Sequence, residues 1–389
     1  MMIVWIIVST LVLALAWFYL GRRLITRGIA DRRRRRIAWW ALGVYFATVI
    51  AAMMLARYRE EWNAPLSWIA YTLLGPLSFV FTFLVIRDLL LLVGRGVTLL
   101  RRRRSRAQPF DMERRDHLVQ VSNLGILAAA ASLSGYGIYE ARRRPGIVEI
   151  TAPIARLPLS FVGFRIVQIT DLHAGLTIGR DWIEGIVDEV RALKPDLIAF
   201  TGDMVDGSVA HLRDTVAPLA ELQAPYGKFF VTGNHEYYSG VEEWVEEARR
   251  LGYDVLNNEH RVIERGGSSI VLGGVTDHTG GQFLREHISD PAKAMLGAPA
   301  DTARILMAHQ PKAIFKTASL GIDLILSGHT HGGQFFPWNL AAAIDQPYIS
   351  GLHDHNGTLI YVSRGTGYWG PPVRLAARSE ITVITLGSV

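Results

Sequence analysis

Long apolar runs near the start of the chain restrict its possible folds more than any other feature. Residues 3–20, 37–56 and 66–86 form three such runs, and 118–139 forms a weaker one that is rich in Ala, Ser and Gly. Each has about the 20 residues that a helix needs to cross about 30 Å of hydrocarbon. A cleavable signal peptide would account for the first run only. We therefore predict an all-α region, residues 1–145, with four membrane spans.

The net charge changes sign along the chain. Residues 1–145 contain 22 arginines, no lysine and 8 acidic residues, a net charge of +14, whereas the remainder has 19 basic and 27 acidic residues, a net charge of −8. A basic membrane region joined to an acidic domain differs from a basic surface that binds nucleic acid, so we expect no nucleic-acid partner. The chain has no cysteine, which excludes a disulfide framework, a thiolate nucleophile and any Cys-ligated metal.

The arginines also predict how the spans are oriented. Arginine clusters lie between the first and second spans and between the third and fourth, whereas the middle loop has only Arg57 and Arg59, beside Glu60 and Glu61. Short Arg-rich loops stay in the cytoplasm. We therefore expect a multi-pass protein of a bacterial inner or plasma membrane, with everything after Tyr139 on the extracytoplasmic side.

A second feature agrees with this orientation. Residues 113–118, ERRDHL, precede the fourth apolar segment and resemble a twin-arginine export signal, although His117 stands where that motif usually has an apolar residue. Such signals are read by machinery that moves folded domains, with a metal already bound. The alternative is that these are two ordinary arginines of an Arg-rich cytoplasmic loop.

Residues 146–389 alternate short apolar runs with amphipathic stretches, which is the pattern of an α/β domain. We predict helices at 182–193, 211–222 and 241–251. We predict strands at 165–170, 197–201, 228–232, 269–272, 304–308, 324–326, 359–362 and 381–386.

Side chains that bind metals follow several of these strands, where α/β sheets place their sites. They occur in five blocks, which are TDLHAG at 170–175, GDMVD at 202–206, GNHE at 233–236, AHQP at 308–311 and GHTHGGQ at 328–334. Carboxylate, amide and imidazole without thiolate favour divalent manganese, iron or zinc. The candidates are too many for one ion, so we expect two ions about 3.5–4 Å apart that share a carboxylate and activate a water molecule.

The ordered blocks DxH, GDxxD, GNHE, a lone His and GHTH resemble the calcineurin-like metallophosphoesterase superfamily over residues 164–386. The GHTHGGQ block and the ending that begins with Tyr361 resemble a bacterial membrane-associated branch. That branch includes twin-arginine-exported phosphodiesterases and UDP-2,3-diacylglucosamine pyrophosphatases. The resemblance implies a sandwich of two mixed β-sheets flanked by helices. It also implies two divalent ions, manganese before zinc or iron.

The same resemblance implies two metal sites that share Asp203. The first site comprises Asp171, His173, Asp203 and His331, and the second comprises Asp203, Asn234, His309 and His329. His235 would be the catalytic histidine, and Asp206 would orient a ligand or a water molecule. The AHQP block departs from the family pattern, which puts substrate contacts near Gln310 in doubt.

Two weaker features remain open. Arg364, in the SRG block, is a candidate contact for a substrate phosphate. The apolar residues 335–344 and the segment at Trp369 follow metal-binding blocks. They are either a rim that binds acyl chains or touches the bilayer, or part of the core.

We therefore expect a membrane-anchored, dinuclear-metal phosphoesterase. Its substrate would be a phosphoester or pyrophosphate of a lipid or envelope precursor, attacked by a hydroxide that bridges the two ions. One alternative is a UDP-2,3-diacylglucosamine pyrophosphatase of lipid A biosynthesis, which requires a cytoplasmic site. Another is a non-catalytic or sensory membrane protein with a phosphoesterase output domain.

Overall fold

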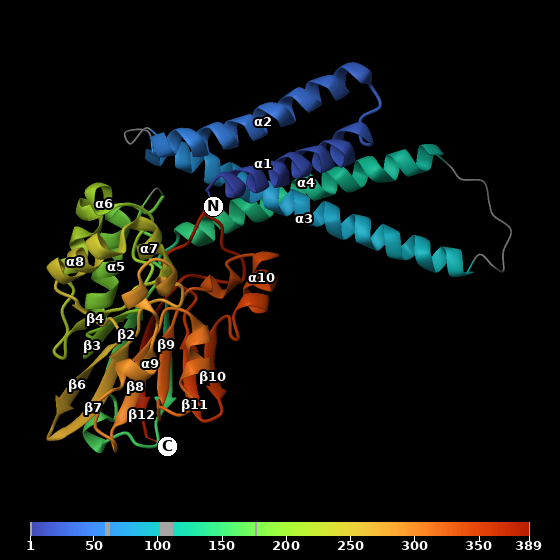
Figure 1. Cartoon of the computed structure of the whole chain (residues 1–389). Helices are drawn as coiled ribbons and strands as arrows, with labels where there is room; N and C mark the ends of the chain where they lie inside the picture. Colours follow the sequence, from blue (N-terminus) through green and yellow to red (C-terminus); the bar gives the residue numbers. More distant parts are fainter. Residues whose placement is uncertain (1, 59–62, 102–111, 176, 389) are drawn as a thin grey trace. The chain divides into compact units, whose positions relative to one another are not determined.

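The computed structural model describes residues 2–58, 63–101, 112–175 and 177–388 (Figure 1). Contacts within the chain divide it into two compact units, Met1–Gly137 and Ile138–Val389. The last turn of helix α4 (Met112–Arg142) belongs to the second unit, because Ala141 packs in that unit's core.

The first unit is helical. It comprises α1 (Met2–Leu20), a π-helical turn (Gly21–Thr26), α2 (Arg32–Tyr58), α3 (Asn63–Arg101) and most of α4. Two of the described helices have segments long and apolar enough to cross a bilayer, Pro65–Thr98 and His117–Arg142. The other two predicted spans lie in α1 and α2, and a region of four spans stays a prediction.

The predicted orientation of the spans depends partly on two segments near the limits of the described residues. The twin-arginine-like residues 113–118 fall in the first turns of α4. The basic residues 102–106 and the loop residues 59–61 lie outside the described residues.

Polar side chains tie the helices of the first unit together. Asp88 of α3 pairs with Arg23 Nε at 2.6 Å and accepts a hydrogen bond from the Tyr19 hydroxyl at 2.8 Å. Arg87 donates to Asn123 Oδ1 of α4 at 2.5 Å, and Asn123 Nδ2 donates to the Arg23 carbonyl at 3.3 Å. Arg87 and Asp88 of α3 therefore have partners on neighbouring segments, as charges within a long apolar helix require.

The second unit contains two six-stranded mixed sheets. The first sheet has the order β1-β12-β2-β3-β4-β5, and its only antiparallel pair is β12 with β2. The second sheet has the order β10-β11-β9-β8-β7-β6, and the pair at each of its two edges is antiparallel. The strands of the first sheet are β1 (Gly146–Pro153), β2 (Arg165–Ile169), β3 (Leu197–Phe200), β4 (Lys228–Phe230), β5 (Asp254–Val255) and β12 (Glu380–Gly387). Those of the second are β6 (Glu259–Arg265), β7 (Ser268–Gly274), β8 (Ala303–Met307), β9 (Leu324–Ser327), β10 (Gly351–His355) and β11 (Thr358–Val362).

The central strands are buried on both faces, which explains their continuous apolar runs. Ile166 and Leu326 belong to the core between the two sheets. Val167, on the opposite face of β2, packs instead with Ile186 of a covering helix, and Ile325 belongs to a third core on the outer side of the second sheet.

The covering helices complete the layers. They are α5 (Arg180–Ala192), α6 (Val209–Val216), α7 (Asn234–Ser239), α8 (Val241–Arg250), α9 (Pro291–Ala294) and α10 (Trp338–Asp345). Two mixed sheets with flanking helices confirm the predicted sandwich. The short helices α7, α9 and α10 and the strands β1, β5, β6 and β10 were not predicted.

We predict that Leu326→Ala lowers the unfolding free energy of the second unit by about 2–5 kcal/mol, because it leaves a cavity between the sheets. Calorimetry of the detergent-solubilised full chain measures this change. The matched control is Leu296→Ala, at a side chain that is 78% exposed, which should change stability by about 0.5 kcal/mol or less. Equal effects of the two changes would contradict the described core.

Candidate metal centre

The metal-binding blocks meet because the strands that carry them end at one edge. Since β2, β3 and β4 are parallel, Asp171, Asp203 and Asn234 follow strand ends that share an edge of the first sheet. His309 and His329 follow β8 and β9, which are parallel neighbours in the second sheet. The topology thus brings together residues from distant parts of the chain.

Three predicted ligands form a first cluster of buried side chains. The candidate ligand atoms of Asp171, His173 and His331 lie within 4.8 Å of one another. His173 Nε2 is 3.0 Å from His331 Nε2, and His331 Nε2 is 3.5 Å from Asp171 Oδ1.

A second cluster comprises Asp203, His309 and His329. His309 Nε2 lies 3.1 Å from Asp203 Oδ2 and 3.2 Å from His329 Nδ1. Asp203 Oδ2 is also 3.8 Å from His173 Nε2 of the first cluster. One carboxylate therefore joins both clusters.

The hydrogen bonds around these rings fit divalent metal ions. Asp206 Oδ1 accepts from His173 Nδ1 at 3.0 Å, and the Thr201 carbonyl accepts from His309 Nδ1 at 2.8 Å. With an acceptor at Nδ1, the ring atom of His173 and of His309 that faces the other ligand atoms is Nε2, the atom that would bind a metal. Buried Asn234 Oδ1 has no hydrogen-bond partner among the described residues. Nitrogen and oxygen ligand atoms that converge in this way suit borderline divalent cations.

His235 lies beside the shared carboxylate. Its backbone N–H donates to Asp203 Oδ1 at 2.9 Å, and its Nδ1 is 2.5 Å from Asp206 Oδ1. Burial lowers its pKa, but the negative charges of Asp203 and Asp206 prevail and raise the pKa of His235 to about 9. The side chain is 14% exposed, so a substrate can reach this proton donor.

The two metal-binding aspartates differ in electrostatic character. Burial raises the pKa of Asp171. Burial acts in the same direction on Asp203, but the neighbouring His309 and His235 hold the pKa of Asp203 well below its usual range. Asp203 is therefore a permanent anion at the centre of the site.

The backbone around the ligands is strained. Of the ten described non-glycine residues with positive φ, five are predicted ligands, namely Asp171, His173, Asp203, His329 and His331. Such conformations cost about 1–3 kcal/mol each and are typical of functional sites.

Glu236, to which the sequence analysis assigned no role, holds together two loops that carry predicted ligands. Its buried carboxylate accepts from the backbone N–H groups of Asp203 at 3.0 Å, Met204 at 2.7 Å and Gly233 at 2.6 Å. The loops approach so closely that a Cβ at Gly233 would overlap the Asp203 carboxylate. This role could have been found from the sequence, because Glu236 lies three residues after Gly233 and this is the spacing of a capping box.

Arg374 was also missed, and no motif marks it. Its buried guanidinium donates to the carbonyls of Ala377 at 2.7 Å and Arg364 at 2.8 Å, and Nη2 lies 3.0 Å from His331 Nδ1. Burial lowers the pKa of Arg374 to about 10, so it stays charged at neutral pH. Burial, His173 and Arg374 lower the pKa of His331, which keeps the imidazole neutral, as a metal ligand must be.

The two residues considered for substrate contact already have protein partners. Arg364 Nε donates to buried Glu380 Oε2 at 2.6 Å, which anchors the guanidinium. Gln310 Nε2 donates to both oxygens of Asp277 at 3.1 Å, and Gln310 Oε1 accepts from Gln346 at 3.2 Å. Gln310 therefore links protein segments, whereas Arg364 stays a candidate for phosphate contact.

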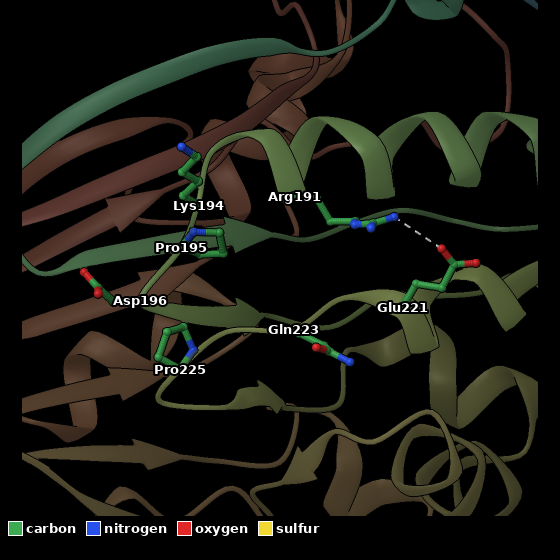
Figure 2. Close-up of a pocket in the computed structure, with 7 residues that line it drawn as sticks. All are labelled: Arg191, Lys194, Pro195, Asp196, Glu221, Gln223 and Pro225. Carbon is green, nitrogen blue, oxygen red and sulfur yellow. Dashed lines mark hydrogen bonds and ion pairs between the residues drawn. The ribbon is translucent and has the colours of Figure 1, made fainter.

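A surface hollow of about 580 Å³ lies away from this chemistry (Figure 2). It precedes β3 and β4, at the sheet edge opposite the metal-binding loops, and its Arg191 and Glu221 pair at 3.5 Å. Its lining residues are Arg191, Lys194, Pro195, Asp196, Glu221, Gln223 and Pro225. They include none of the predicted ligands.

Comparisons with known proteins agree with the site. The calcineurin-like phosphoesterase family profile matches residues 164–333. A zebrafish (Danio rerio) transmembrane protein with metallophosphoesterase domain is 34% identical over 393 residues, covering 96% of this chain and 87% of that protein. The chain belongs to the calcineurin-like metallophosphoesterase family. It is thus a metal-dependent phosphoester hydrolase.

Other relatives extend this family across kingdoms. A Bos taurus transmembrane protein with metallophosphoesterase domain is 37% identical, covering 82% of this chain and 73% of that protein. A metallophosphoesterase of Helicobacter pylori strain J99 is 37% identical, covering 71% of this chain and 73% of that protein. Similarity alone therefore does not restrict the chain to bacteria.

We predict that Asp206→Asn weakens metal binding by about 10–100-fold, because the amide orients His173 less firmly than the carboxylate does. Competition between the purified full chain and a chelator, with bound metal measured by mass spectrometry, gives the change in affinity. Asp301→Asn, at an exposed carboxylate, is the control. Unchanged affinity in Asp206→Asn would contradict the role assigned to this hydrogen bond.

Proposed function

We propose that this chain is a membrane-anchored phosphoesterase with two divalent ions, acting on a phosphoester or pyrophosphate of a lipid or envelope precursor. The observation that carries the proposal is the Asp203 carboxylate, which lies between two histidine clusters. A single-ion site would not require a carboxylate shared in this way.

We propose the following assignment of ligands to the two ions. One ion would be bound by Asp171, His173 and His331. The other would be bound by Asn234, His309 and His329. Asp203 would bind both ions. Manganese is our first choice, with zinc and iron as alternatives. When bound, the ions would make water nucleophilic near neutral pH and offset charge on the phosphoryl oxygens.

His235 has a separate part in the proposed reaction. Its raised pKa keeps it protonated at neutral pH, so it can give a proton to the departing oxygen. Asp206 contacts Nδ1 of both His173 and His235 and so orients a metal ligand and the proton donor together. Arg364, anchored by Glu380 through Nε, would contact a substrate phosphate through its remaining N–H groups.

The proposed substrate and location follow from the membrane region. Two relatives are named transmembrane proteins, and α4 contains a segment able to cross a bilayer. A site held near a membrane meets lipid phosphoesters at high local concentration. We place the chain as a multi-pass protein of a bacterial inner membrane, with its catalytic unit outside the cytoplasm. The twin-arginine machinery is a proposed partner in export.

We predict that the metal-stripped full chain in detergent regains phosphoesterase activity when manganese, zinc or iron is added. Substrates should include a lipid phosphodiester and a soluble aryl phosphodiester. Asp203→Ala should abolish turnover, and His235→Ala should lower kcat by about 10²–10⁴-fold. Asp301→Ala should match the unaltered chain. Two bound metals without turnover on any phosphoester would overturn the proposed catalysis and favour a sensory role.

We also predict that a reporter fused after the end of the chain is active on the extracytoplasmic side, because the arginine clusters hold their loops inside. Paired alkaline phosphatase and fluorescent-protein fusions measure this orientation. A reporter found in the cytoplasm would contradict it. That result would favour a UDP-2,3-diacylglucosamine pyrophosphatase, whose substrate is cytoplasmic.

A further inference from the structure

Helix α10 carries apolar side chains that the fold leaves exposed. Trp338 is 55% exposed, Leu340 54% and Ile344 88%, and none of the residues of α10 is buried. Leu340 and Ile344 are one turn apart and share a face of the helix. With the exposed Phe336 and Trp369 they form what we call the apolar rim. Core packing, the other interpretation of this segment, does not explain exposed side chains.

The apolar rim is built onto the metal-binding motif. Gln334, which closes the GHTHGGQ block, donates to the Trp369 carbonyl at 2.9 Å and accepts from the Trp369 N–H at 3.0 Å. The Trp369 ring lies 5.6 Å from that of His235, edge to face. Within the second unit, Figure 1 shows α7, which begins with Asn234, and α10 at the same end of the two sheets. The rim therefore borders the site.

The membrane helix enters the second unit at this same edge. Strand β1 is parallel to β12, which is antiparallel to β2, and Gly146 pairs with Glu380. The first residue of β1 therefore lies where β2 ends and the metal-binding loops begin. Only residues 143–145 separate α4 from β1, and they span roughly 10–14 Å at most. The chain thus connects the end of α4 directly to the edge of the sheet that carries the predicted metal-binding loops.

We propose that the apolar rim inserts into the surface of the bilayer that anchors the chain, so that the site takes phosphoester substrates from the plane of the membrane. This inference rests on the proposed function and names the surface through which it acts. Tryptophan and branched apolar side chains beside a polar site are the composition of an interfacial helix. The charge of Asp345, at the end of α10, is paired with Lys312 at 2.7 Å, which lowers the cost of approaching lipid.

The absence of cysteine allows a direct test with single labels. Ile344→Cys in the full chain, labelled with an environment-sensitive fluorophore and reconstituted in phosphatidylethanolamine and phosphatidylglycerol vesicles, should be quenched by brominated lipid. The matched control is Leu159→Cys, which precedes β2 at the opposite edge, is 87% exposed and should remain accessible to an aqueous quencher. Equal responses at the two positions would overturn the proposed insertion.

A second measurement separates this proposal from the catalytic one. The variant Leu340→Glu/Ile344→Glu should lower the ratio of lipid to soluble phosphodiester turnover at least tenfold, through KM for the lipid. Leu159→Glu, at the opposite edge, should leave the ratio unchanged. A parallel loss on both substrates would indicate a purely structural role and overturn the proposal. Lipid quenching at Ile344 in a chain with no metal-dependent turnover would instead overturn the proposed function and retain the insertion.

Discussion

The Asp203 carboxylate carries a negative charge where the chain excludes water, and the surrounding structure is arranged to hold it there. A buried charge is costly unless it is paired and hydrogen-bonded. Asp203 Oδ1 accepts the His235 N–H, and Oδ2 lies 3.1 Å from His309 Nε2. Glu236 fixes the loop of Asp203 to the loop that begins at Gly233. Five predicted ligands have positive φ, a strained backbone conformation. Such strain persists only where many surrounding contacts hold the backbone in place, as they do here.

Much of this arrangement could be predicted because each motif directly follows an apolar strand. Parallel strands place their carboxyl ends together, so the blocks at Asp171, Asp203 and Asn234 had to meet once the sheet was assigned. Arg374 could not be found in this way. Its partners are backbone carbonyls of its own loop between β11 and β12, which come close to the guanidinium only when this loop is folded. The sequence also did not decide whether the apolar residues after GHTHGGQ are buried or exposed, because periodicity does not distinguish a buried helix from an exposed one.

The first unit has a different constraint. Arg87 and Asp88 interrupt the long apolar helix α3, and each has a partner on a neighbouring segment, Asn123 of α4 and Arg23 of the π-helical turn. Paired charges of this kind hold helices in register without needing a water-filled path. This pattern favours an anchor over a conduit. The charges are visible in the sequence, but their partners, 36 and 65 residues away, could be identified only once the helices were packed.

The direction of β12 determines at which edge of the first sheet the chain enters the second unit. Had β12 been parallel to β2, β1 would have begun at the opposite edge, roughly 17 Å further from the metal-binding loops for a five-residue strand. Instead β1 begins beside Glu380, whose carboxylate anchors Arg364 at the rim of the site. The last turn of α4 packs into the core of the second unit through Ala141, so only three residues separate the end of this helix from β1. A soluble substrate gains nothing from that connection. A phosphoester in a bilayer gains proximity and orientation, which is why we connect the direction of one strand to the choice of substrate.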